Sequence, residues 1–97
     1  MNTEQAKTQA FIFAEDVETD EYIIDYLTIF YEENGVDGLT QALGHIARKK
    51  GMSDIAKKAH VSRQNLYRTL VENGKPNLAT FDKVIHAMGF KLAIVPV

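Results

Sequence analysis

The sequence predicts a mostly α-helical domain of five helices that ends in a short β-strand. Apolar residues recur at the three- and four-residue spacing of amphipathic helices through most of residues 19–89. Capping residues precede these periodic stretches and glycines follow them. In residues 90–97 the apolar period switches to two, which is typical of a strand. The length of 97 residues is that of one ordinary domain, so residues 1–97 are expected to form a single unit.

Residues 1–35 are predicted to form an N-terminal arm followed by the first helix. The first ten residues are polar and aperiodic, and the "AFIFA" segment after them is predicted to be a short extended piece or a packed arm. The helix is expected over residues 19–34, because Thr19 is a suitable N-cap and apolar residues follow it at helical spacing. Asn34 and Gly35 are expected to end it.

Residues 36–89 contain four further periodic stretches. The first, residues 37–50, is predicted to be a helix with Asp37 as its cap. Gly44 lies inside it at a cost of about 1 kcal/mol relative to Ala, which close packing would explain. A short helix capped by Ser53 is expected to follow.

The remaining elements are two helices and a strand. Ser62 is a good N-cap for one helix, in which Leu66 and Leu70 lie one turn apart, and Asn77 is expected to cap the last helix. Residues 90–97, "FKLAIVPV", are predicted to form a strand that needs a pairing partner. That partner is expected to be "AFIFA", the same strand of a second chain, or a different protein.

The composition excludes several classes of protein. The absence of Cys excludes disulfides and thiolate metal sites and fits a reducing cytoplasm. No apolar run approaches the roughly 18 residues of a membrane span. The segment "MNTEQAKTQAF" lacks the basic start and apolar stretch of a signal peptide, so none is expected. The three His lack metal-binding spacing, and no Gly-rich phosphate loop follows a strand. No catalytic residue, metal or cofactor is therefore predicted, and the protein is not expected to be an enzyme.

The charge is distributed unevenly along the chain. Residues 1–44 contain one Lys and ten Asp or Glu, a net charge of −9, whereas residues 45–97 contain ten Lys or Arg and three Asp or Glu, a net charge of +7. Such asymmetry indicates partners of opposite charge, or a nucleic acid bound by one half. The alternative is that the two halves neutralise each other within the molecule.

The stretch "DIAKKAHVSRQNLYRTL" has the pattern of a helix-turn-helix. Ala56 and Ala59 are small enough for two helices to cross, and Val61 provides a buried apolar residue in the turn. Leu66 and Leu70 would anchor the second helix and leave its polar side chains free for the major groove. The alternative is a solvated helical hairpin within a bundle.

The second helix carries side chains that suit base readout. Arg can donate two hydrogen bonds to guanine, and Gln can pair similarly with adenine. The predicted base contacts are Arg63, Gln64 and Arg68. The predicted contacts to the DNA backbone are Ser62, Asn65, Lys57 and Tyr67.

From about Phe13 to Val95 the chain resembles the HigA-type addiction-module antidote family, which are antitoxins with a Cro/C1-type helix-turn-helix. The resemblance is carried by "ALGHIARKKGMSDIAKKAHVSRQNLYRTLVENGKPNLATFDKVIHAMGFKL" and, more loosely, by "DEYIIDYL". It implies a helix-turn-helix core over residues 36–89 that binds operator DNA and represses its own operon. It also implies a partner, a small basic ribonuclease toxin of the RelE/HigB type, which the antitoxin binds and neutralises.

The acidic N-terminal helix is expected to face that basic toxin, since opposite charges steer association. Aromatic residues are common anchors at such interfaces. The alternative for the aromatic residues is that they belong to the core. The predicted toxin contacts are Asp20, Glu21, Tyr22, Asp25 and Tyr26.

Two residues depart from the family pattern. His60 stands where the turn usually carries Gly, which is preferred because a left-handed backbone is often needed there. Asp54 lies near the start of the first helix of the motif, where its charge would repel a phosphate.

A homodimer is expected, because a two-fold protein places two recognition helices in grooves about one turn apart on a palindromic site. The C-terminal strand and the last helix are the predicted interface. One alternative function is a free-standing phage-type repressor without a toxin. Another is an interaction module whose helix pair contacts only protein.

Overall fold

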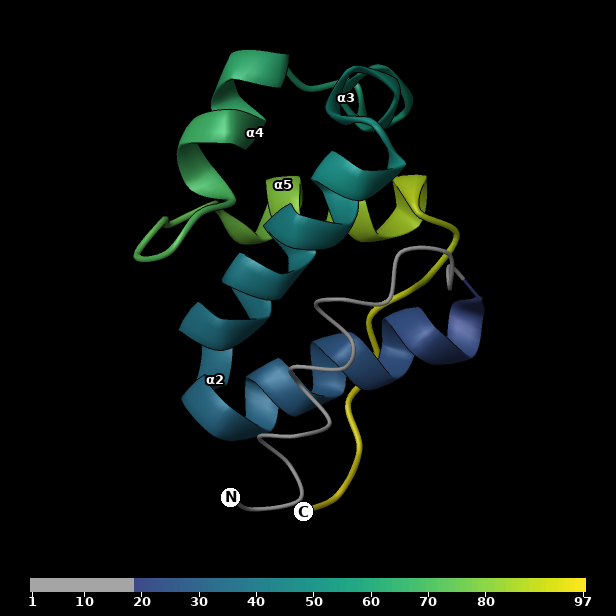
Figure 1. Ribbon diagram of the computed structural model, residues 1–97, viewed down its shortest axis with the longest axis vertical. Coiled ribbons are helices and arrows are strands. Elements are labelled where there is room, and N and C mark those ends of the chain that lie inside the picture. Colours follow the sequence, from purple (N-terminus) through teal and green to yellow (C-terminus); the bar gives the residue numbers. More distant parts are fainter. Residues whose placement is uncertain (1–18) are drawn as a thin grey trace.

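The structure, a computed structural model, describes residues 19–97, which form four helices packed around one apolar core (Figure 1). With the numbering of Figure 1, the helices are α2 (Asp20–Lys50), α3 (Met52–Ala59), α4 (Arg63–Thr69) and α5 (Leu78–Ala87). The predicted mostly helical character is confirmed. The predicted N-terminal arm with "AFIFA" lies outside the described residues.

The described residues contain four helices where five are predicted, because the first two predicted helices form one bent element, α2. The backbone inside α2 leaves the helical region at Asn34 (φ −145°, ψ 25°) and Gly35 (φ 59°, ψ −145°). Glycine adopts a positive φ at little cost, so the chain turns at the predicted stop without a loop. Gly38 lets the bend close, because a Cβ there would collide with the Phe30 carbonyl oxygen. The result is a first arm before Asn34 and a second arm after Gly35, which run in different directions in Figure 1.

Three of the predicted helix caps are confirmed. The side chains of Thr19, Ser62 and Asn77 each accept a hydrogen bond from the backbone N–H three residues later, at 3.1, 3.0 and 2.7 Å respectively. Each bond satisfies one of the N–H groups that a helix start leaves without an internal partner. The starts of α2, α4 and α5 are therefore set locally by the sequence.

Two predicted caps are wrong. α3 begins at Met52, one residue earlier than a Ser53 cap would place it, and its N-cap is Gly51 without a side-chain hydrogen bond. The Met52 side chain is buried in the core, so tertiary packing stabilises this earlier first turn. Asp37 lies inside α2, and its carboxylate pairs with the Lys75 ammonium group at 3.3 Å instead.

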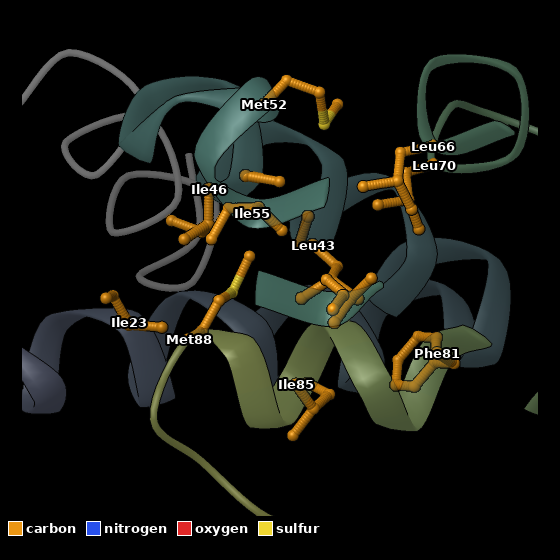
Figure 2. Packing of buried hydrophobic residues seen from close by; sticks show 14 of the residues in the cluster. Ile23, Leu43, Ile46, Met52, Ile55, Leu66, Leu70, Phe81, Ile85 and Met88 are labelled. Carbon is orange, nitrogen blue, oxygen red and sulfur yellow. The ribbon is translucent and has the colours of Figure 1, made fainter. Parts of the chain in front are cut away.

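The core forms where α3 packs against α2, α4 and α5. Apolar side chains from all four helices meet there (Figure 2). No buried side-chain nitrogen or oxygen lacks a hydrogen-bond partner in the described part of the chain. Tyr31 lies one helical turn after Leu27, which packs partly buried against the core, but the Tyr31 side chain is exposed. The core side chains labelled in Figure 2 are Ile23, Leu43, Ile46, Met52, Ile55, Leu66, Leu70, Phe81, Ile85 and Met88.

The predicted C-terminal strand is not formed, and residues 19–97 contain no strand. After α5 the Phe90 N–H donates to the Ile85 carbonyl oxygen at 3.1 Å, and the chain beyond it is exposed. A strand needs a neighbour to satisfy its backbone groups, and the described residues supply none. The alternating pattern at the C-terminus therefore does not by itself produce a strand. None of the helices within residues 19–97 combines the length and apolar character needed to cross a membrane.

Candidate nucleic-acid interface

A three-residue turn joins α3 to α4. His60 has left-handed backbone angles (φ 57°, ψ 43°), so the expected left-handed conformation is present without glycine. The Val61 N–H donates to the Ala56 carbonyl oxygen at 3.1 Å, and the Val61 side chain packs against the core. The turn is thus held from inside by an apolar contact and by a backbone bond to the last turn of α3.

α4 is anchored by one apolar face. Leu66 and Leu70 are fully buried, as the sequence predicts. The opposite face carries no acidic residue and is exposed to solvent in the described chain. In Figure 1, α3 is seen almost end-on while α4 lies across the view, so the two helices cross steeply. The exposed side chains of α4 are Arg63, Gln64, Tyr67 and Arg68.

The start of α4 presents two polar side chains that are already ordered. The Ser62 hydroxyl oxygen accepts from the Asn65 N–H, which leaves the hydroxyl proton available for another acceptor. The Thr69 hydroxyl donates to the Asn65 carbonyl oxygen at 2.8 Å and lies 3.3 Å from the Asn65 side-chain oxygen. The Asn65 side-chain oxygen thus faces Thr69, and the NH₂ group of the same side chain is the part that can donate to an acceptor on DNA.

The Tyr67 ring lies beneath two guanidinium groups. The central carbon of Arg63 is 5.3 Å from the ring centroid, and that of Arg48 is 5.5 Å from it. The Arg63 guanidinium also donates a long hydrogen bond of 3.4 Å to the Tyr67 hydroxyl. Arg48 comes from the last turn of α2, and the sequence contains no local signal for this contact because 19 positions separate it from Tyr67.

The lysines near the helix pair differ in their partners. Lys57 is exposed on α3 and has no ion-pair partner among residues 19–97. Lys58 pairs with Asp54 at 3.0 Å, one turn apart on α3. This pair offsets part of the carboxylate charge that the sequence places near a phosphate, although an exposed pair contributes only about 0–1 kcal/mol of stability.

The acidic residues and the tyrosines at the start of α2 differ in exposure: the acidic side chains are exposed, whereas two tyrosines are buried. Asp20, Glu21 and Asp25 are exposed on the first arm of α2. Tyr22 and Tyr26 are buried, with 7% and 3% of their surface exposed, so the core alternative is the observed one. The toxin contact predicted for these two rings stays a prediction, and the core contacts of the rings weigh against it.

Two partly buried contacts hold Tyr26 in place. Its hydroxyl and the Nδ1 atom of His45 are 2.8 Å apart, and its ring stacks on Phe30 with centroids 4.7 Å apart. Burial, with a smaller contribution from Tyr22, raises the pKa of the Tyr26 phenol to about 12. Burial also lowers the pKa of His45, and the positive charge of Arg48 adds to that effect. Both side chains are thereby favoured in their neutral forms.

The exposed apolar residues of the first arm were not among the predicted contacts. Ile24 and Tyr31 are about half exposed and lie seven positions apart, which is two helical turns. They share the exposed side of the first arm with the acidic residues. Helical spacing alone could not identify them, because the sequence does not say which of two apolar stripes faces the core.

The chain is similar in sequence to a family of known proteins and to a curated relative. A family model described as "Probable addiction module antidote protein" matches residues 7–96. A curated protein of Haemophilus influenzae, described as "Uncharacterized protein", is 38% identical over 92 residues, which cover 95% of this chain and 93% of the relative. No solved structure matches the chain.

Proposed function

The chain belongs to the family of probable addiction module antidote proteins, and we propose that it is the antitoxin of a type II toxin–antitoxin module. In this proposal it binds operator DNA as a sequence-specific autorepressor, through a Cro/C1-type helix-turn-helix formed by α3 and α4. It also binds and neutralises a RelE/HigB-type ribonuclease toxin. It acts in the cytoplasm and has no catalytic activity of its own.

The observation that carries the DNA-binding proposal is the two-sided character of α4. Leu66 and Leu70 bury one side, while the other side is exposed and contains no acidic residue. A major groove accepts one α-helix, and the side chains that reach it must come from such an exposed face. The proposed base contacts are Arg63, Gln64 and Arg68.

The helix start supports contacts to the DNA backbone. The Ser62 hydroxyl and the Asn65 amide each retain a donor, and the exposed Lys57 adds a positive charge on α3. Phosphate contacts of this type fix the register of a protein on DNA without reading its sequence. The hydroxyl of Tyr67, on the same helix, is the fourth proposed backbone contact.

The exposed side of the first arm is the proposed toxin-binding surface. It combines the carboxylates of Asp20, Glu21 and Asp25 with the exposed side chains of Ile24 and Tyr31. A basic ribonuclease would be attracted by the acidic charges and held by the apolar contacts. Tyr22 and Tyr26 are left out because the core covers them.

The proposed unit on DNA is a homodimer, since two-fold symmetry would match a palindromic operator. Each copy would then present one α4 to the major groove. Residues 90–97 and α5 are the proposed interface. The exposed apolar side chains of Ile94 and Val95 support this placement, because burial in an interface would remove them from water.

A binding assay with the upstream promoter fragment tests the DNA-binding role. Arg63→Ala and Gln64→Ala are each expected to weaken binding by roughly 5- to 150-fold, which corresponds to about 1–3 kcal/mol. Lys49→Ala, which removes an exposed positive charge from α2, outside α4 and outside the proposed interface, is the matched control and should change affinity much less. Unchanged binding in both α4 variants would contradict the assignment of α4 as the recognition helix.

Co-expression with the adjacent gene tests the toxin-binding role. The proposal expects a stable complex with a small basic RelE-like protein and relief of its toxicity. Operator binding without any such complex would favour the free-standing phage-type repressor. Toxin binding without operator binding would favour an interaction module.

A further inference from the structure

The guanidinium of Arg48 is fixed by two contacts to α4. It lies over the Tyr67 ring, and it donates to the Leu70 carbonyl oxygen at 3.2 Å. Leu70 is the C-cap of α4, whose last carbonyl groups lack partners within the helix. A positive charge at this end is also favoured by the helix dipole. Arg48 is thereby committed to contacts inside the protein.

Arg63 meets the same ring from within α4. Arg63 and Tyr67 are four residues apart, so their side chains are neighbours on one helix face. Tyr67 is 40% exposed. The Arg63 guanidinium lies over its ring and donates the 3.4 Å hydrogen bond to its hydroxyl. A free arginine side chain has about 2 kcal/mol of rotamer entropy to lose when it binds. A side chain that is already held loses less of it on meeting DNA.

We propose that Arg48 and Tyr67 are positioning residues that hold the Arg63 guanidinium ready for base readout. In this arrangement operator specificity depends on Arg48, which lies outside the α3–α4 pair and does not itself touch the bases. The inference rests on the proposed DNA-binding function and deepens it. It gives Tyr67 a role besides its proposed phosphate contact, because its ring supports Arg63 while its hydroxyl remains able to donate.

The test compares Arg48→Met with Lys49→Met, which removes the neighbouring charge of the same helix turn without touching the Tyr67 stack. Affinity is measured for the operator and for a set of single-base substitutions of it. The base pair that Arg63 reads is the one at which Arg63→Ala loses discrimination. Arg48→Met is expected to lower discrimination at that base pair at least about fivefold, within the range of one bidentate contact. Lys49→Met should leave it unchanged.

The salt dependence separates positioning from phosphate contact. A lost phosphate contact lowers the slope of log affinity against log salt concentration by about one. Arg48→Met is expected to keep the wild-type slope. A reduced slope with unchanged base preference would overturn the proposal and make Arg48 a phosphate contact. In an Arg63→Ala background, Arg48→Met should have no further effect on base preference.

Variants of Tyr67 test the ring itself. Tyr67→Phe retains the ring and should retain base discrimination, whereas Tyr67→Leu should lose it as Arg48→Met does. Circular dichroism and thermal melting check that each variant is folded. Equal discrimination by Tyr67→Leu and the wild type would overturn the proposal.

A measurement on the DNA-free protein distinguishes failure of this inference from failure of the proposed function. The δ-methylene protons of Arg63 should show a ring-current shift in the nuclear magnetic resonance spectrum, and Tyr67→Leu should abolish it. Arg48→Met should reduce it if Arg48 holds the ring in place. An absent shift in the wild type would overturn the positioning role even where operator binding is intact. If the Arg63 protons show the ring-current shift but neither the wild type nor any variant binds the operator, the proposed DNA-binding function is contradicted. The role of Arg48 and Tyr67 in operator specificity is then contradicted as well.

Discussion

The α-carbon of Gly44, in the second arm of α2, lies directly against the backbone carbonyl of Leu70 at the end of α4. A Cβ at Gly44 would collide with the Leu70 carbonyl oxygen. The same Cβ would lie 2.9 Å from the Arg48 guanidinium nitrogen that donates to this carbonyl oxygen. The glycine therefore allows α4 to dock on α2 and brings the Leu70 carbonyl within reach of Arg48.

Gly44→Ala is expected to destabilise the protein by about 1–3 kcal/mol, although alanine is the better helix former, because two backbones must separate to admit the methyl group. Chemical denaturation measures the free energy of unfolding. Thr28→Ala, at an exposed position of the same helix, is the control and should be neutral or slightly stabilising. A stable Gly44→Ala variant would show that the contact with Leu70 relaxes easily.

The pair of Tyr26 and His45 is expected to make stability depend on pH. The pKa of His45 is lowered in the folded state from its ordinary value of 6.5, so the unfolded chain binds the proton more readily. The stabilisation is then fully present above pH 6.5 and is lost as the pH falls through the lowered folded-state pKa. His45→Gln should flatten the pH dependence of the melting temperature in this window. An identical pH dependence in both proteins would contradict the prediction.

Tyr26→Phe removes the hydroxyl from the same partly buried pair while keeping the ring. It is expected to cost about 0.5–1.5 kcal/mol, the usual contribution of one hydrogen bond. Thermal melting measures the loss, and Tyr31→Phe serves as the control because the Tyr31 ring is about half exposed. Equal stability of the two variants would show that the hydroxyl contributes nothing to the fold.

Two matching caps allow stability to be separated from DNA binding. Ser62 and Asn77 each cap one helix through the same type of hydrogen bond. Replacement of either by Ala should lower the free energy of unfolding by about 0.5–2 kcal/mol. Only Ser62→Ala should also weaken operator binding at a temperature where both variants are folded. Weakened binding in Asn77→Ala to the same extent would indicate that cap loss alone explains the effect.

His60 is expected to carry a backbone cost that glycine would relieve. Left-handed angles cost a non-glycine residue roughly 1–2 kcal/mol, and the greater entropy of glycine in the unfolded chain offsets part of the gain. His60→Gly should therefore be neutral or more stable by up to about 1 kcal/mol. His60→Val should be clearly destabilised, because a β-branched residue tolerates these angles poorly. Denaturant titration of both variants provides the comparison.

The acidic residues of the first arm are predicted to accelerate toxin binding. The triple variant Asp20→Asn, Glu21→Gln, Asp25→Asn should lower the association rate constant at low salt by about tenfold or more, with a smaller effect at high salt. Stopped-flow or surface-binding kinetics measure this rate. Glu72→Gln with Asp82→Asn, which removes acids from the basic half, is the control. Equal rates for both variants would argue against steering by this face.

Much of the helical framework could be predicted because its signals are local. Thr19, Ser62 and Asn77 cap helices through groups only three residues away, and the apolar spacing of α4 identifies Leu66 and Leu70 as its buried side. The predictions that failed depend on distant contacts. Packing of Met52 moved the start of α3, and the C-terminal residues found no strand partner within the described chain.

The sequence by itself determined where most helices start, which side of α4 is polar, and how the charge divides along the chain. Only the tertiary structure decided that Tyr22 and Tyr26 belong to the core, because an amphipathic helix with two apolar stripes does not specify which one is covered. It also brought Arg48 from α2 onto Tyr67 beside Arg63. The physical reason is that a cap or a helical period involves neighbours in the chain, whereas burial and stacking depend on residues that meet only after the chain has folded.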